Sequence, residues 1–263
     1  MDRISDPSAT PQRLFTDGDD LAGIQGTIVR DVWLNGMQEE AMTLLLAGDQ
    51  VGNVNDNTLW RHAVSRIGRR RAVLTASGSW TVPATVVRIA VKIWGGGGGS
   101  GGTYGPTAAS LGGGYGEDEF DVVPGTVLPV TIGAGGVGGV GGVNPTAGGP
   151  GGTSSLGTLC SATGGMGGAP SSSGFPPGVS AGGSAYGTAL AINGSTCSAP
   201  FAIANGLVTS QGGAAFGGLI AHFGAAYGSA LGIPGAFPGG GASGSAAQAG
   251  GGAGAPGVIV IFY

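Results

Sequence analysis

The sequence predicts a mainly β domain with packed polyglycine-II-type helices, preceded by a small α-helical region. Glycine supplies 61 of the 263 residues, and only 9% of the residues are charged. Hydrophobic residues still make up 41% of the chain, whereas disordered segments are normally poor in them. After Asp121 there is no further Asp, Glu, Lys or Arg. We therefore expect a folded chain whose interior is rich in backbone and poor in side chains.

Residues 1–70 contain nearly all the helix-like sequence, and residues 71–78 form a linker to the next domain. Asp31 is a candidate N-cap for a helix over 32–47, and Gly48 is a candidate stop. Aliphatic and aromatic residues recur along this helix at spacings of four, four and three, which places them on one face. They are Trp33, Met37, Ala41 and Leu44.

A second, shorter helix is expected over 58–67, capped by Asn57 and ended by Gly68. Two helices of this size bury little apolar surface by themselves. They therefore need each other, a neighbouring chain, or both.

The domain over 79–263 is expected to begin and end on strands. Residues 78–94 are typical of a strand, because apolar residues at 87, 89, 91 and 93 alternate with the residues between them. The apolar stretch 258–263 lies beyond all the glycine. We expect it to pair with the first strand and so to close the domain.

A hairpin is expected around Pro124 and Gly125, between strands over 120–123 and 128–132. Just before it, acidic side chains alternate along the chain. On a strand, Glu117, Glu119 and Asp121 would point to one face and Asp118 to the other. We interpret this as a solvated strand face, with a cation or sugar contact as the alternative.

The glycine shows a local three-residue period, with valine at every third position of 135–143. This period matches a helix of the polyproline-II type, which has three residues per turn and no internal hydrogen bonds. Helices without Cβ atoms can approach closely and bond to one another through backbone groups. A buried, unpaired backbone group costs about 1–3 kcal/mol, so we expect a rigid, almost fully hydrogen-bonded array of such helices.

A set of motifs in a fixed order gives the C-terminal domain a resemblance to a known family. The motifs lie at 80–83, 94–99, 112–116, 123–125, 131–136, 151–157 and 254–260. Together they resemble the glycine-rich domain found at the ends of bacteriophage tail fibres. The sequence at 33–40, Trp-Leu-Asn-Gly-Met-Gln-Glu-Glu, is similar to a helix common near the start of tail-fibre proteins.

The resemblance implies a homotrimeric tail fibre that is fixed to the virion by its N-terminus. Its partners would be tail, baseplate or adaptor proteins at one end and a glycan or outer-membrane protein of the host bacterium at the other. The first helix would serve attachment and trimerisation through Trp33, Leu34, Met37, Ala41 and Leu44. The alternative is a structural tail or baseplate protein that never meets a receptor.

Receptor contacts are expected on loops carried by a rigid scaffold. The candidate side chains are aromatic residues and one histidine of the C-terminal domain, although each can instead fill space in the core. They are Tyr104, Phe175, Phe201, Phe216, His222, Phe223, Tyr227 and Phe237. Residues 169–179 and 219–238 interrupt the glycine pattern most and are the preferred tips.

We expect no enzymatic activity, cofactor or metal site. The glycines at 95–99 lack the Lys-Ser/Thr pair of a phosphate-binding loop, and His222 has no acid within its half of the chain. Residues 122–263 contain no Lys or Arg, so this region is not expected to bind nucleic acid, whose affinity depends on these residues.

The N-terminus lacks a signal-peptide pattern, and no apolar stretch is long enough to insert in a membrane. We therefore expect synthesis in the host cytoplasm and assembly into the virion. Under those conditions Cys160 and Cys197 are expected as two thiols rather than a disulfide.

Overall fold

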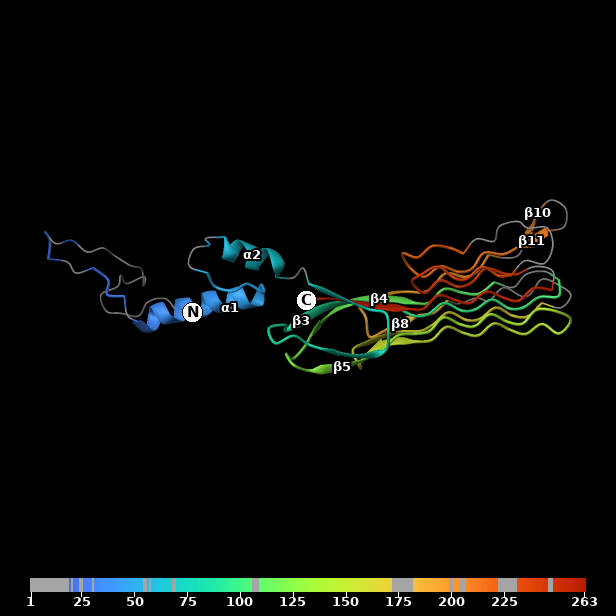
Figure 1. Cartoon of the computed structure of the whole chain (residues 1–263), viewed down its shortest axis with the longest axis horizontal. Coiled ribbons are helices and arrows are strands. Elements are labelled where there is room, and N and C mark those ends of the chain that lie inside the picture. Colours follow the sequence, from blue (N-terminus) through green and yellow to red (C-terminus); the bar gives the residue numbers. More distant parts are fainter. Residues whose placement is uncertain are drawn as a thin grey trace. The chain divides into compact units, whose positions relative to one another are not determined.

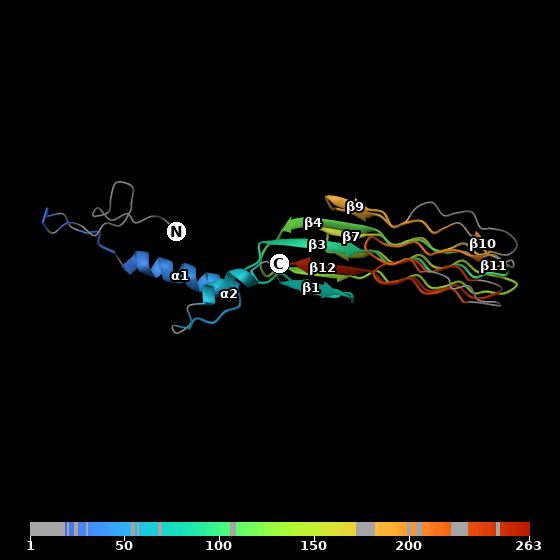
Figure 2. The ribbon, with the colours of Figure 1, turned by 90° about the horizontal axis from the view of Figure 1, so that it is seen from above.

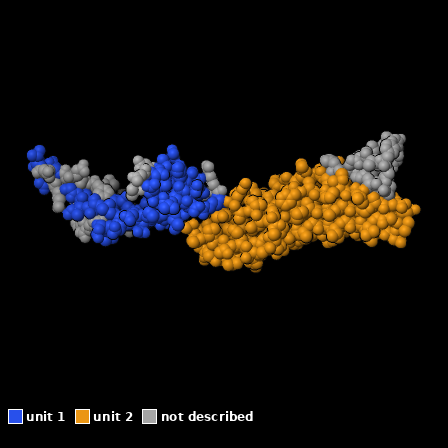
Figure 3. Space-filling view, in the orientation of Figure 1, with its two compact units in different colours: residues 1–70 blue, residues 71–263 orange. Residues whose placement is uncertain are grey.

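A computed structural model describes most of the chain. The described residues are 19, 21–23, 26–29, 31–53, 56, 58–67, 70–105, 109–171, 182–198, 201–203, 207–221, 231–245 and 248–263, with backbone only for 201–203 and 207–209. The chain divides into two compact units, residues 1–70 and 71–263 (Figures 1 and 3). Within the described residues, no helix has the length and apolar character needed to cross a membrane.

Unit 1 contains the helix α1 (Asp31–Ala47) and the shorter helix α2 (Leu59–Arg66). The predicted helices are therefore confirmed, with ends that differ by about one residue. Gly48 follows α1 as expected, and its N–H donates to the carbonyl of Leu44 at 3.1 Å.

The chain before α2 is fixed by Asp56, whose carboxylate accepts hydrogen bonds from the N–H and the hydroxyl of Thr58 at 2.8 and 2.6 Å. Asn57 and Gly68, the expected cap and stop of this helix, lie outside the described residues.

Unit 2 is mainly β and is built on two antiparallel five-stranded sheets. The first sheet, shown in Figure 2, has the strand order β1 (Arg71–Leu74), β12 (Val258–Phe262), β3 (Arg88–Trp94), β4 (Tyr115–Asp121) and β9 (Leu190–Ile192). The second has the order β2 (Gly78–Thr81), β5 (Val127–Thr131), β6 (Ser154–Leu156), β7 (Cys160–Ala162) and β8 (Ala185–Tyr186). A separate pair joins β10 (Phe201–Ile203) to β11 (Leu207–Thr209).

The hydrophobic core of unit 2 lies between these two sheets. Alternate residues of β3, namely Ile89, Val91 and Ile93, are at most 1% exposed, and Ile259 and Ile261 of β12 are fully buried. They form one cluster with apolar residues of the second sheet, Val130, Leu156, Cys160, Ala162 and Ala185. Each buried Ile or Val stabilises the fold by about 1.5–3 kcal/mol, so the alternation seen in the sequence defines the core face of β3.

The last strand closes the unit as predicted. β12 lies between β1 and β3 and is antiparallel to both, with Ile261 opposite Val91 and Val260 opposite Val73.

The predicted hairpin around Pro124 and Gly125 is wrong, because its two strands belong to different sheets. β4 pairs with β3 and β9, whereas β5 pairs with β2 and β6. Gly125, with φ +78°, makes a turn that crosses between the sheets, and its N–H donates to the carbonyl of Val82 at 2.9 Å. β4 is instead paired with β3 along its whole length, and three of its acidic residues face Arg88 and Lys92 of that strand.

The predicted strand over 78–94 is also interrupted. β2 belongs to the second sheet and β3 to the first, and residues 82–87 connect them through a turn. Pro83 lies in this connection, where it avoids the loss of a ladder hydrogen bond that a proline causes inside a sheet.

Candidate functional site

Beyond the strands, the chain forms a bundle of extended segments that run away from the sheets (Figures 1 and 2). We call these segments the glycine array; they are residues 95–103, 109–114, 132–142, 146–153, 163–171, 182–184, 193–198, 210–215, 218–221, 231–236, 240–245 and 249–257. We call the end of the array next to the strands the sheet end, and the end away from the strands the far end.

Segment 95–103 shows how the array is bonded. Its N–H groups donate hydrogen bonds to three neighbouring segments in turn along the chain. Residues three apart therefore donate to the same neighbour. Gly96, Gly99 and Gly102 donate to carbonyls of 146–152 at 2.9–3.0 Å. The next residue of each triplet, at 97, 100 and 103, donates to carbonyls of 249–255 at 2.8–3.2 Å.

The carbonyls of the same segment accept bonds with the same period. Those of Gly96, Gly99 and Gly102 accept from N–H groups of 165–171, and those at 97, 100 and 103 accept from 136–142. Bonds to 111–114 and to Ala242 complete the set. Segment 95–103 is thus bonded to six neighbours, which satisfies nearly all of its buried backbone groups.

Close packing explains why these positions are glycine. A Cβ built on Gly96, Gly99 or Gly102 would overlap a carbonyl oxygen of segment 134–140. Segment 132–142 itself lies at the surface of the array. Its valines point outward, with Val137 at 73% and Val140 at 66% exposure, whereas Gly136 and Gly139 are buried.

Buried serine hydroxyl groups form further hydrogen bonds within the array. The Ser110 hydroxyl donates to the carbonyl of Gly98 at 2.6 Å and accepts from the N–H of Ala242 at 2.8 Å. The Ser100 hydroxyl accepts from the N–H of Gly252 at 2.8 Å. The sequence analysis missed these residues, because a serine within glycine resembles a loop.

Among the predicted receptor residues whose side chains the structure describes, Tyr104 lies at the far end of the array. It follows Thr103, its N–H donates to the carbonyl of Ser171 at 2.8 Å, and its side chain is 45% exposed.

Phe216 and Phe237 lie at the sheet end instead. The Phe216 carbonyl accepts a hydrogen bond from the Trp94 indole at 2.8 Å. Phe237 precedes Gly239 in a turn, where the N–H of Gly239 donates to the carbonyl of Pro256, just before β12. The structure therefore does not bring these two phenylalanines together with Tyr104.

The side chains of the other candidates are not described. Phe201 begins β10, but its side chain is not described. Phe175, His222, Phe223 and Tyr227 lie outside the described residues, as do most of the preferred tips.

An aromatic cluster joins the first sheet to the array. The Tyr115 ring lies 4.7 Å from that of Trp94 and 4.6 Å from that of Phe216. Its hydroxyl donates to the Glu117 carboxylate. Burial, followed by this hydrogen bond, raises the pKa of Tyr115, and the same bond, with help from Lys92, lowers the pKa of Glu117.

The acidic side chains of β4 point to the two faces of the strand as the sequence predicts, with Asp118 opposite to the other three. Glu117 lies 3.2 Å from the Lys92 ammonium, and Arg88 lies 3.8 Å from Glu119 and 2.9 Å from Asp121. The Asp118 carboxylate accepts from the N–H of Ala189 at 2.7 Å. Each carboxylate of this strand therefore has a partner within unit 2.

The two cysteines are both described and are not joined by a disulfide. Cys160 belongs to the core, where burial, with Asp118 nearby, raises the pKa of its thiol to about 11. In the part of the chain that the structure describes, no three His, Cys, Asp or Glu side chains gather as a metal site.

In unit 1, the predicted stripe of α1 is only partly covered. Leu34 and Met37 are 52% and 40% exposed, and Trp33, Ala41 and Leu44 are half-buried. The residue that α1 buries is Leu45, which the sequence analysis did not select.

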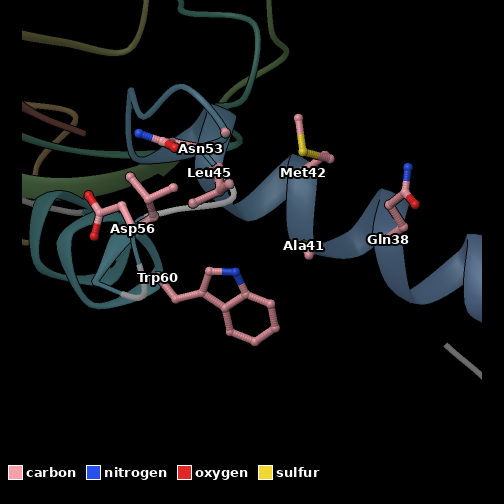
Figure 4. Close-up of a pocket in the computed structure, with 9 residues that line it drawn as sticks. Gln38, Ala41, Met42, Leu45, Asn53, Asp56 and Trp60 are labelled. Carbon is pink, nitrogen blue, oxygen red and sulfur yellow. The ribbon is translucent and has the colours of Figure 1, made fainter.

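An apolar groove of about 630 Å³ lies beside this stripe (Figure 4). It is lined by Gln38, Ala41, Met42, Leu45, Gly52, Asn53, Asp56, Leu59 and Trp60.

The fold and its bonding define unit 2 as a two-sheet β domain that carries a glycine array. A family model described as a glycine-rich domain matches residues 73–263, so the chain belongs to this glycine-rich domain family. A search of curated proteins gave no match.

Proposed function

We propose that this chain is a bacteriophage tail-fibre protein. Unit 1 attaches it to the virion, and the far end of the glycine array recognises the surface of the host bacterium. The observation that carries this proposal is the array itself, which supports exposed loops on a tightly bonded scaffold that contains no charged side chain. Recognition loops carried by rigid scaffolds are a common design of binding proteins.

The segments of the array are, in this proposal, polyglycine-II-type helices. Their hydrogen bonds recur every three residues, and segment 95–103 has six bonded neighbours. Both features agree with helices of three residues per turn that bond only to one another. In this proposal the array holds Tyr104 in a defined position, which reduces the conformational entropy lost when a receptor binds.

The receptor is a surface glycan or an outer-membrane protein, and Tyr104 is the described side chain best placed to touch it. Its exposed ring offers a flat apolar face with a polar hydroxyl, a combination favoured at binding surfaces. The absence of Asp, Glu, Lys and Arg after Asp121 favours recognition through apolar contacts and hydrogen bonds over ion pairing.

The functional assembly is a homotrimer, docked on tail, baseplate or adaptor proteins. Three copies bring three weak sites to one surface, and linked sites bind far more tightly than single ones. The exposed apolar residues of α1 and the similarity of residues 33–40 to tail-fibre helices support a role of unit 1 in assembly.

Binding of the purified, fluorescently labelled chain to susceptible bacteria tests this proposal. We expect labelling of the cell surface, strong reduction in a Tyr104→Ala variant, and no change in a Val137→Ala variant, which alters an exposed side chain away from the far end. A chain that fails to label cells while present in intact virions is instead a structural tail or baseplate protein.

A further inference from the structure

We propose that the groove of unit 1 is a docking site for a second copy of this chain, whose Met37 and Leu44 side chains enter it from α1. This inference rests on the proposed trimer and specifies the contact that forms it. Its physical basis is a mismatch between the apolar surface that unit 1 displays and the little that it buries.

Unit 1 has a very small core of its own. Among its described residues, Leu45 and Ala63 are the only buried apolar side chains. Many others are exposed: Val32, Leu34, Met37, Met42, Leu46, Val51, Trp60, Val64 and Ile67 each expose at least 40% of their surface. A unit of this size cannot be stabilised by two buried side chains, so it needs apolar contacts from elsewhere.

The packing of α1 against α2 shows where these contacts are lacking. The two helices meet at small residues, since a Cβ on Gly48 would overlap the backbone of Ala63. This close approach involves the C-terminal end of α1, where Leu45 is buried. Toward the N-terminus of α1, Leu34 and Met37 stay 52% and 40% exposed. An extended apolar face of α1 is thus left for another chain.

The groove has the chemistry to receive aliphatic side chains. Ala41, Met42 and Leu45 of α1 form one wall, and Leu59 and Trp60 of α2 form the other (Figure 4). Asp56 is the acidic residue of its lining, and the carboxylate is already bonded to Thr58. An engineered apolar cavity of about 150 Å³ holds a benzene molecule, so about 630 Å³ has room for several side chains.

The spacing along α1 indicates that the occupant is the same helix of another copy. Leu34, Met37, Ala41 and Leu44 fall at successive first and fourth positions of a seven-residue repeat, the seam by which parallel helices associate. Gln38 and Leu45 come directly after Met37 and Leu44, the two fourth positions of the repeat. They therefore lie along one side of the apolar seam, and both line the groove. In a bundle of parallel helices, this side of one helix contacts the apolar seam of the next helix at the same height along the bundle. Met37 and Leu44 of the neighbour are therefore the side chains that fill it.

A three-variant comparison of the full chain tests the inference by its oligomeric state, measured by light scattering and native mass spectrometry. We expect a trimer for the unchanged chain. Met37→Glu and Trp60→Glu each place a charge in the occupied groove and raise the dissociation constant roughly a hundredfold or more. Val32→Glu is the control, since Val32 is 77% exposed and lies on the opposite side of α1 from the seam.

A photo-crosslinking amino acid at position 60 gives a second readout that does not depend on the stability of a variant. Trimers are assembled from isotopically labelled copies that carry the probe and unlabelled copies that do not. We expect labelled-to-unlabelled crosslinks in the peptide that contains Met37 and Leu44, and none from a probe at position 32.

The results separate this inference from the proposed function. A trimer that Trp60→Glu leaves intact and that gives no such crosslink overturns the groove assignment, while the fibre proposal stands. A monomeric chain that still labels bacteria overturns the groove assignment and the trimer but keeps receptor recognition. A trimer that gives the crosslink and is weakened by Trp60→Glu, but labels no cells, supports the groove and contradicts the function.

Discussion

Replacement of Gly99 by alanine tests the packing of the glycine array most sharply. The φ angle of Gly99 lies outside the left-handed region, so alanine suits its backbone. If the array were loosely packed, this substitution would stabilise the protein by about 0.4–1 kcal/mol, because it restricts the unfolded chain. In the structure, however, the added Cβ would overlap the carbonyl oxygen of Val137. The sign of the effect therefore reports the packing.

The expected magnitude follows from what must move. Displacing a packed segment costs about 1–3 kcal/mol. The two hydrogen bonds of Gly99, to Gly149 and from Gly168, contribute about 1 kcal/mol each. Together these terms give a loss of about 3–5 kcal/mol, which for a unit of this size lowers the Tm by about 6–20 °C.

Scanning calorimetry of the full chain measures this effect in the transition of unit 2. Gly105→Ala is the matched control, since a Cβ at Gly105 meets no atom within 4 Å. We expect the control to change the Tm by no more than a few degrees. An unchanged or raised Tm for Gly99→Ala would refute the close packing of the array.

Three further outcomes are expected. Tyr115→Phe removes the main cause of the low pKa of Glu117, so that pKa rises in an NMR titration. Because a lowered pKa stabilises the fold at neutral pH and the gain is lost as pH falls through it, the variant also shows a weaker acid dependence of stability; an unchanged Glu117 titration contradicts this. Cys160, with a thiol pKa of about 11, reacts slowly with iodoacetamide at pH 8 until the protein is unfolded; fast labelling of the peptide that contains Cys160 in the native protein contradicts its burial. Ser110→Ala removes the 2.6 Å bond to the Gly98 carbonyl and the 2.8 Å bond from the N–H of Ala242, which keeps its 3.2 Å bond to Gly98, and lowers stability by about 1–2 kcal/mol in a denaturant titration; a variant as stable as the original shows that this hydroxyl is dispensable.

Local patterns in the sequence predicted the helices and strands that depend on residues close together in the chain. The helix that ends before Gly48 and the alternation of Ile89, Val91 and Ile93 were both found from spacing alone. The closing strand was also predicted correctly, because its apolar residues need a partner on the core face of the first strand.

The hairpin failed because turn residues specify a turn and not the sheet to which each arm belongs. Pro124 and Gly125 do form the turn, but β4 pairs along its whole length with β3, an earlier strand of the other sheet. Sequence spacing alone does not show such long-range pairing.

The sequence showed the three-residue period of valine but not which way these side chains point. In the structure Val137 and Val140 are exposed. The end of the array at which an aromatic residue lies depends on how many segments precede it and where each one turns. Phe216 and Tyr104 therefore looked equivalent in the sequence, although Phe216 packs beside Tyr115 at the sheet end.

The position of the chain in the intact virion tests the central proposal most directly. Electron cryomicroscopy of virions, with a small tag fused to the chain end at Tyr263, locates unit 2 and gives the number of copies. The fibre proposal predicts three copies per fibre, with the far end of the array pointing away from the particle and free to touch the host. An array enclosed within the baseplate, or chains absent from the virion, would contradict it.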